Sequence, residues 1–146
     1  MWQSESLRPT MTEYRVGTYA FHDRSSVAAG AAALDDVAMT VRATVVSCPT
    51  GTRAILDAGS KALSFDPAPD PGHGLILEAR GSRIVTLNEE HAYVDVAPGD
   101  SLELGQQVRV VPNHTCVVSN LFDEFLVESR GEIVDRWTIE ARGRST

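Results

Sequence analysis

The stretch that decides the interpretation of this chain is residues 110–121, which read VVPNHTCVVSNL. It begins as an apolar, β-branched run that Pro112 ends, because proline cannot donate to a strand ladder. His114 and Cys116 follow the break, and imidazole with thiolate is a ligand pair that zinc prefers. An extended backbone would place both side chains on one side, whereas a regular helix would separate them by about 200°. Two ligands suit an open, catalytic type of metal site, although a single free cysteine is more often a small buried hydrophobe.

The bulk properties are those of one globular domain. The chain has 146 residues, of which 42% are hydrophobic and 23% charged. Its formal net charge of −7 argues against a nucleic acid or an anionic membrane as partner. No apolar run approaches the ~20 residues of a membrane span, and the start lacks signal-peptide features, so we expect a cytoplasmic protein. Two cysteines are too few for a disulfide framework.

The pattern along the chain predicts a mainly β fold. Residues 1–12 are polar and aperiodic and are expected to form a flexible leader, and residues 13–146 to form one domain. Short β-branched and aromatic runs separated by glycine and proline turns predict a small β-barrel or folded sandwich of short antiparallel strands, with one or two short helices. The expected hairpins pair residues 37–47 with 53–57, 74–78 with 83–87, and 125–129 with 132–137. A further strand is expected over residues 14–21, and Trp137 is expected in the core.

Several stretches together resemble one known family. They are YRVGTYAF (14–21) with Asp23 beyond it, ILDAGSKALS (55–64), EEH (89–91), VPNHTC (111–116), NLFDE (120–124) and DRWTIEARGR (135–144). In that order they are similar to the C-terminal D-serine dehydratase-like domain of the fold-type III, pyridoxal-phosphate-dependent D-serine dehydratases and D-threonine aldolases, which is related to the alanine racemases. The resemblance covers residues 14–144 and implies a mainly β barrel.

The resemblance also implies a function. The chain would be the metal-binding C-terminal domain of a lyase or aldolase acting on D-β-hydroxy amino acids, with zinc (or manganese) at His114 and Cys116. The ion would act as a Lewis acid on the substrate β-hydroxyl. The family's N-terminal α/β barrel, which carries the pyridoxal phosphate lysine, is missing from this sequence. Lys61 is the single lysine and does not correspond to it, so we expect no activity without a barrel domain or subunit as partner.

Three further residues are candidates for the substrate side or the surroundings of the metal. His91, in the EEH stretch, could line the site, and Glu89 and Glu90 beside it could equally form a solvated turn. Asp57 ends an apolar strand before small residues, which is a common way to present a carboxylate to a cleft. Tyr19 could face a ligand, although a strand aromatic is more often part of the core.

Other functions remain open at this stage. A thiolate favours zinc and slightly favours a dehydratase, but dehydratase and aldolase are nearly level. The alternative from another class is a non-catalytic, stand-alone β-barrel module that binds a metal or a partner, including a second copy of itself as a homodimer. A zinc hydrolase would need a general base near the ion, for which only Glu124 and Asp57 have the right type.

Overall fold

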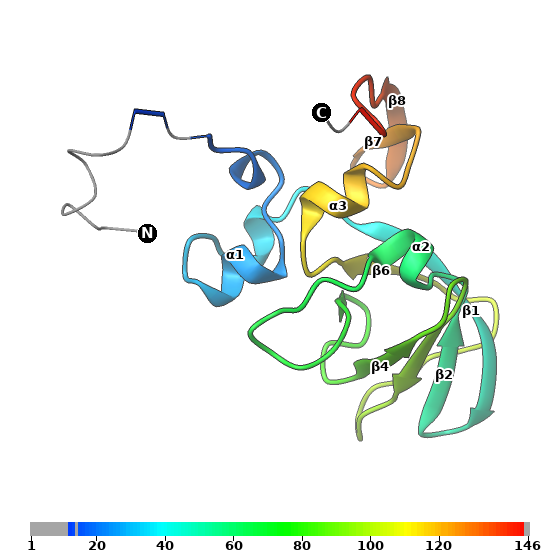
Figure 1. Cartoon of the computed structure of the whole chain (residues 1–146). Coiled ribbons are helices and arrows are strands. Elements are labelled where there is room, and N and C mark those ends of the chain that lie inside the picture. Colours follow the sequence, from blue (N-terminus) through cyan, green and yellow to red (C-terminus); the bar gives the residue numbers. More distant parts are fainter. Residues whose placement is uncertain (1–11, 14, 145–146) are drawn as a thin grey trace.

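The computed structural model describes residues 12–13 and 15–144. The predicted flexible leader over residues 1–12 therefore lies, apart from Thr12, outside the described residues. Figure 1 shows short helices beside a group of strands, and each label there corresponds to a residue range. The elements in chain order are η2 (Thr18–Ala20), α1 (Arg24–Ala28), η3 (Leu34–Asp36), β1 (Val41–Thr50), β2 (Arg53–Leu56), α2 (Ser60–Leu63), β3 (Leu75–Ile76), β4 (Arg83–Leu87), β5 (Ala92–Asp95), β6 (Gln107–Val111), α3 (Thr115–Ser119), β7 (Glu124–Ser129) and β8 (Glu132–Thr138).

Six strands form one antiparallel sheet in the order β3-β6-β1-β2-β5-β4. The two ends of this order, β3 and β4, come close together, so the sheet is a nearly closed barrel. A backbone hydrogen bond bridges the remaining gap, because the N–H of His73, just before β3, donates to Ile84 O in β4 (3.1 Å). Near closure leaves few unpaired strand edges, which protects a small β domain from edge-to-edge association.

The barrel core follows from strand alternation. In β1, Val41, Ala43 and Val45 are buried while the residues between them are exposed or half-buried. Successive strand residues point to opposite faces, so the same alternation brings inward most of the other small and branched side chains of the core. In β4 a register irregularity between Ile84 and Thr86 lets both Ile84 and Leu87 face inward. The remaining core residues lie on five strands. These are Ala54 and Leu56 of β2, Ile76 of β3, Ile84 and Leu87 of β4, Ala92 and Val94 of β5, and Val108 and Val110 of β6.

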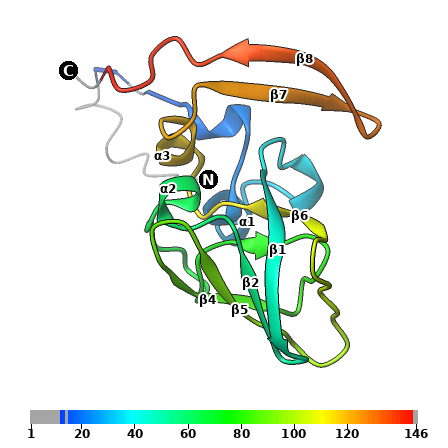
Figure 2. The ribbon, with the colours of Figure 1, turned by 90° about the vertical axis from the view of Figure 1, so that its right-hand side faces the viewer.

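The last two strands, β7 and β8, form a separate two-stranded sheet. In Figure 2 this hairpin extends away from the barrel, and α3 lies between the two. The hairpin contacts the rest of the chain through Phe125, whose ring lies 5.2 Å from that of Phe21. An ion pair between Glu128 and Arg42 adds a second link (3.0 Å).

The mainly β prediction is confirmed, with some differences in detail. Three short α-helices occur where one or two were expected. The hairpins β1–β2 and β7–β8 are confirmed, but residues 74–78 and 83–87 do not pair, since β3 pairs with β6 and β4 with β5. Residues 18–20 form a 3₁₀ turn where a strand was expected, and Trp137 is 54% exposed and not in the core. The two strands of the last hairpin were predicted from the sequence, but the exposure of Trp137 depends on how the hairpin packs against the rest of the chain.

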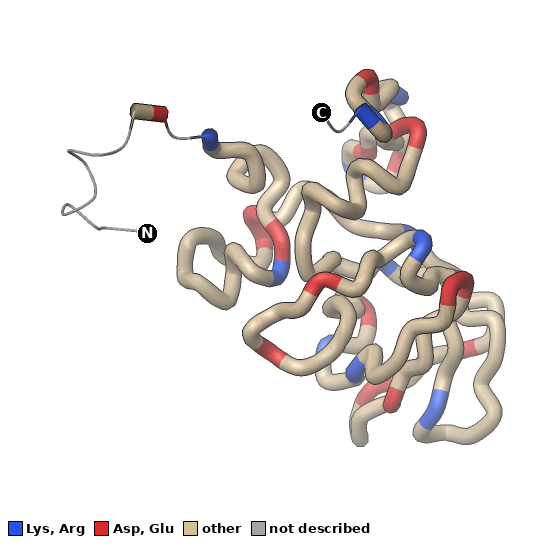
Figure 3. Tube along the Cα trace, in the orientation of Figure 1, with Lys and Arg blue, Asp and Glu red and all other residues tan. Residues whose placement is uncertain are grey.

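Charged residues of both signs are interspersed along the described chain (Figure 3). Several of the basic ones pair with acidic neighbours from other elements, such as Arg109 with Glu78 and Lys61 with Glu90. None of the helices described is long and apolar enough to cross a membrane.

Candidate metal site

The His-x-Cys pair lies where the chain leaves β6 and enters α3. Pro112 and Asn113 are buried beyond the end of the strand, and His114 is the residue before the first helical turn, with an extended backbone (φ −144°, ψ 119°). The helix then begins at Thr115, so Cys116 belongs to its first turn. The local geometry is therefore neither a continuous strand nor a regular helix, but an extended residue followed by a helical one.

His114 is held on one side by a buried carboxylate. Its Nδ1 lies 3.1 Å from Oδ2 of Asp23, which is completely buried, while the His114 side chain itself keeps 36% of its surface exposed. Among the described residues, nothing forms a hydrogen bond with Nε2 of His114. The ring is thus fixed through one nitrogen and has the other available.

Cys116 has an exposed thiol, and its described polar contact comes from a residue close to Asp23 in the sequence. Its Sγ lies 3.6 Å from Oγ1 of Thr18, five residues before Asp23. The segment from Thr18 to Asp23 therefore contacts the side chains of both His114 and Cys116. Because one short segment reaches both, the two potential ligands face the same part of the molecule.

The turn that carries His114 and Cys116, with the segment from Thr18 to Asp23 beside it, is called here the His114–Cys116 corner. Asp23 makes several of the polar contacts that hold this corner together. Its Oδ1 accepts hydrogen bonds from the backbone N–H and the hydroxyl of Ser26 (both 2.8 Å), which makes Asp23 the N-cap of α1. Its Oδ2 accepts from the Thr115 N–H (3.2 Å) as well as facing His114. Burial by itself raises the pKa of Asp23, but the hydrogen bonds from Ser26 and Thr115 and the charge of His114 outweigh it, so this pKa lies below its ordinary value. The carboxyl is ionised at neutral pH.

The turn before His114 is fixed by a second buried polar group. The Asn113 side chain donates to the carbonyl oxygens of Asp66 (2.8 Å) and Gly72 (2.9 Å), and its oxygen accepts from Arg24 (3.1 Å). Arg24 also donates to Pro71 O (3.0 Å), so the proline-rich loop is tied to the same corner. All polar atoms of this buried group have partners, which rigidifies the base of the His-x-Cys turn.

Sequence reasoning had assigned no role to Asp23, Arg24 or Asn113. For Asp23, the sequence offered two signals: its place in the family-like stretch after residues 14–21, and an aspartate ahead of a short helical segment, which is a common N-cap pattern. Nothing local distinguishes Arg24 or Asn113, because their partners lie more than forty residues away.

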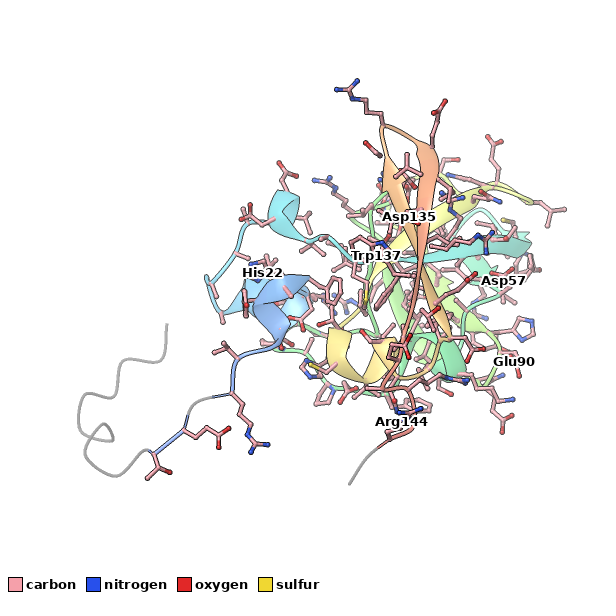
Figure 4. The ribbon with its side chains drawn as sticks, turned by 90° about the horizontal axis from the view of Figure 1, so that it is seen from above. His22, Asp57, Glu90, Asp135, Trp137 and Arg144 are labelled. Atoms are coloured by element: carbon pink, nitrogen blue, oxygen red, sulfur yellow. The ribbon has the colours of Figure 1, made fainter. Side chains whose placement is uncertain are left out.

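Of the three additional candidates, only Tyr19 lies in the segment that contacts the pair. Tyr19 is 66% exposed in η2, beside Thr18. Asp57 instead accepts a hydrogen bond from the Thr44 N–H (2.6 Å) and thereby joins β2 to β1. Figure 4 shows Asp57 and Glu90, the neighbour of His91, on the opposite side of the molecule from His22, the neighbour of Asp23. No described contact links Asp57 or His91 to His114 or Cys116.

The turn that carries His91 is clamped by the start of α2. The backbone N–H groups of Ser60 and Lys61 donate to Asn88 O (2.8 Å) and Glu89 O (3.1 Å). A Cβ atom on Gly59 would lie 2.4 Å from both of these carbonyl oxygens, so only glycine allows this approach. The Gly-Ser turn after Asp57 thus has a structural explanation.

The remaining potential metal ligands, the single lysine and the candidate general base can each be located in the structure. Within the described residues, no group of three or more histidine, cysteine, aspartate or glutamate side chains is placed to hold a metal ion. Lys61 does not fit a Schiff-base role, because its hydrogen bonds with Glu90 and Glu89 raise its pKa and favour the charged ammonium. Glu124, a candidate base for a hydrolase, is paired with Arg136 in the β7–β8 hairpin.

The fold and this corner define a nearly closed β-barrel domain with a His-x-Cys pair at the end of β6. A family model described as "Putative serine dehydratase domain" matches residues 38–128. An uncharacterized protein of Mycobacterium tuberculosis is 42% identical over 130 residues, which cover 84% of this chain and 97% of that protein. The chain belongs to this family.

Relatives of assigned activity are longer enzymes. A D-threonine aldolase of Arthrobacter is 37% identical over 138 residues, covering 92% of this chain and 35% of the enzyme. The structure of a D-threo-3-hydroxyaspartate dehydratase from Delftia superposes with a TM-score of 0.75 at 31% identity, covering 88% of this chain and 38% of that one. The chain therefore spans little more than a third of these enzymes.

Two mutant structures of a D-threo-3-hydroxyaspartate dehydratase are also similar. One is a cysteine-to-alanine mutant in the metal-free form (TM-score 0.75, 30% identity), and the other is a histidine-to-alanine mutant (TM-score 0.72, 29% identity). Each match covers 88% of this chain and 38% of the mutant enzyme's chain. The two mutated positions are two residues apart, with the histidine first.

Proposed function

We propose that this chain is the metal-binding domain of a pyridoxal-phosphate-dependent lyase or aldolase that acts on D-β-hydroxy amino acids. His114 and Cys116 hold a divalent ion, preferentially zinc, in a site that stays open toward the substrate. When bound, such an ion supplies Lewis-acid stabilisation of the β-hydroxyl of the substrate.

The observation that carries the proposal is the shared contact of both side chains with one segment. Thr18 reaches the thiol of Cys116, and Asp23 reaches Nδ1 of His114. Neither potential ligand is sealed in the apolar core, since the thiol is exposed and the imidazole half-exposed. An imidazole nitrogen and a thiolate form a donor set suited to zinc, and two protein ligands leave positions for substrate and water.

The comparison with the dehydratase mutants supports the same pair. In that enzyme a histidine and a cysteine separated by one residue were chosen for mutation, and the cysteine mutant is in a metal-free form. His114 and Cys116 have the same order and spacing.

The rest of the active site must come from another segment. Lys61 is ion-paired and cannot serve the cofactor, so the pyridoxal phosphate and its lysine belong to a barrel domain or subunit that this chain joins. The chain's own contribution is to bind and orient the β-hydroxyl end of the substrate.

Zinc binding by the purified chain tests the proposal directly. We expect one zinc ion per chain in a titration followed by mass spectrometry under non-denaturing conditions, and loss of binding in the variants His114→Ala and Cys116→Ser. Cys48→Ser is the matched control, because Cys48 is the other free, exposed thiol and lies on β1. Replacing zinc by Co²⁺ should give a thiolate charge-transfer band that is retained in Cys48→Ser and lost in Cys116→Ser and His114→Ala. Stoichiometric zinc binding that survives both site variants would contradict the assignment.

A second candidate function is a stand-alone metal-binding module without catalysis. It is favoured by the mycobacterial relative, 97% of which is covered, so that this relative consists of little besides the domain. To separate the two functions, the zinc-loaded chain and pyridoxal phosphate are mixed with D-threonine or D-serine, once with and once without a separately produced barrel domain. Product formation is measured in both mixtures. Turnover that appears only with the barrel supports the lyase or aldolase, whereas zinc binding without turnover in either mixture supports the module.

A further inference from the structure

The imidazole of His114 can bind a metal through only one nitrogen at a time, and the proton decides which one. A neutral histidine carries its proton on either Nδ1 or Nε2, and the unprotonated nitrogen has the lone pair that a metal needs. In a free imidazole the two tautomers interconvert, so a defined metal site requires that something select one of them.

The contacts of Asp23 leave one consistent assignment of that proton. The Asp23 carboxylate is completely buried and lies in contact with four donors or potential donors: the Ser26 N–H and hydroxyl at Oδ1, and the Thr115 N–H and His114 Nδ1 at Oδ2. An ionised carboxylate only accepts hydrogen bonds, so Nδ1 at 3.1 Å must be the donor in the fourth contact. Nε2 is then the unprotonated nitrogen, and none of the described residues forms a hydrogen bond with it.

We propose that Asp23 is a positioning residue of this site: it holds the proton of His114 on Nδ1, so that Nε2 keeps its lone pair for the metal ion that His114 and Cys116 would bind. The inference rests on the proposed metal site for its purpose, but the tautomer itself is a property of the metal-free chain.

The same contacts connect the metal site to the folding of the N-terminal segment. Because Asp23 also caps α1, and because Arg24 and Ser25 bond to the carbonyls of Pro112 and Asn113, the carboxylate cannot shift without moving this helix. The carboxylate is therefore held from two elements, by α1 at Oδ1 and by α3 at Oδ2. A carboxylate held this firmly can also restrict rotation of the imidazole about its χ angles.

The first experiment is nitrogen-15 NMR of the metal-free, wild-type chain, recorded at increasing pH until the histidine signals no longer change and the rings are neutral. The His114 signals are assigned by their absence in His114→Gln. We expect the shifts of a single tautomer protonated at Nδ1. Protonation at Nε2, or an averaged mixture of both tautomers, would overturn the proposal without any mutation of Asp23.

The second experiment measures zinc affinity in Asp23→Asn. Ser26 donates twice to Oδ1, so the amide oxygen of the new side chain is expected to remain there and the NH₂ group to face His114. Nδ1 would then become the acceptor, and the proton would move to Nε2. We expect zinc to bind about 10–100-fold more weakly, as for other carboxylates that orient metal-binding histidines.

The matched control is Ser26→Ala. It removes the hydroxyl bond to Oδ1 and weakens the cap of α1 in a similar way, but leaves Oδ2 and His114 in contact. Its tautomer and zinc affinity should remain those of the wild type. If Asp23→Asn folds and binds zinc as tightly as the wild type, Asp23 has only a structural role. If the wild type binds no zinc, the proposed function fails, while the NMR result still decides the tautomer.

Discussion

The six-stranded barrel and the β7–β8 hairpin both consist of antiparallel strands, but they differ in how much of their side-chain surface is buried. The barrel strands bury one face almost completely, and Leu56, Ile76, Ile84 and Val110 have no exposed surface. Every residue of β8 is exposed, and Leu126 of β7 is 48% exposed. The hairpin is paired from end to end, with one register irregularity between Val127 and Glu128, yet it holds no core of its own.

The difference shows that strand pairing and burial are separate contributions to stability. Isolated two-stranded hairpins are marginal in water, because backbone hydrogen bonds alone contribute little net free energy. The hairpin is anchored by Phe125 on Phe21 and by the Glu128–Arg42 pair, whereas the barrel is anchored by its apolar interior. The His114–Cys116 corner lies between the two, on the chain that leaves β6 for β7, and is attached to the rigid part.

The largest expected effect comes from a matched pair of leucines. Leu56→Ala in β2 should lower the free energy of unfolding by about 2–5 kcal/mol, because it removes a fully buried side chain and leaves a cavity. Leu126→Ala in β7 should change it by about 0.5 kcal/mol or less, since nearly half of that side chain is already in water. Urea unfolding followed by far-UV circular dichroism measures both. Equal losses would mean that the hairpin is buried in the molecule as it exists in solution.

An intermediate and pH-dependent effect is expected from Glu78, which joins the β3 region to β6. Burial by itself raises the pKa of Glu78, but hydrogen bonds from the Arg109 backbone N–H (2.8 Å) and guanidinium (2.9 Å) lower it below its ordinary value of 4.5. A carboxyl with a depressed pKa stabilises the fold above its unfolded value and loses that contribution as the pH falls through the folded value.

Glu78→Gln should therefore be less stable than the wild type by about 1 kcal/mol at pH 7, a figure reduced for partial exposure. The difference should shrink once the pH falls below about 4.5 and vanish in stronger acid. Glu103→Gln is the control, because Glu103 is exposed and forms no side-chain ion pair among the described residues. Unfolding curves at a series of pH values give the comparison, and a difference that grows in acid would contradict it.

The smallest effect is expected from the ion pair that links the hairpin to the barrel. Arg42 and Glu128 are 50% and 37% exposed, so their attraction is weakened by water and salt. A double-mutant cycle with Arg42→Gln and Glu128→Gln should give a coupling energy of about 0.5 kcal/mol or less, decreasing with added salt. A larger, salt-independent coupling would show that the hairpin is held against β1 more firmly than its exposure indicates.

Much of the barrel was predictable because its signal is local. The alternation in Val41–Val45 and the turn at Gly51 identify β1, β2 and their pairing, and the Arg130–Gly131 turn identifies the last hairpin. The error at residues 74–78 and 83–87 has a physical reason. Two neighbouring short strands pair with each other by default, but here β3 pairs with β6 and β4 with β5, and closing the barrel decides between the arrangements.

By itself, the sequence determined that this protein is mainly β and that an imidazole and a thiol stand beyond a proline at the end of an apolar strand. These features follow from residue types and their short spacing, because strand alternation, the break at a proline and the metal preference of a side chain are all local properties. Only the tertiary structure decided that Asp23 meets His114 across 91 residues of sequence and that Arg24 meets Asn113 across 89. Contacts between such distant residues follow from how strands and short helices pack, and packing has no local sequence code.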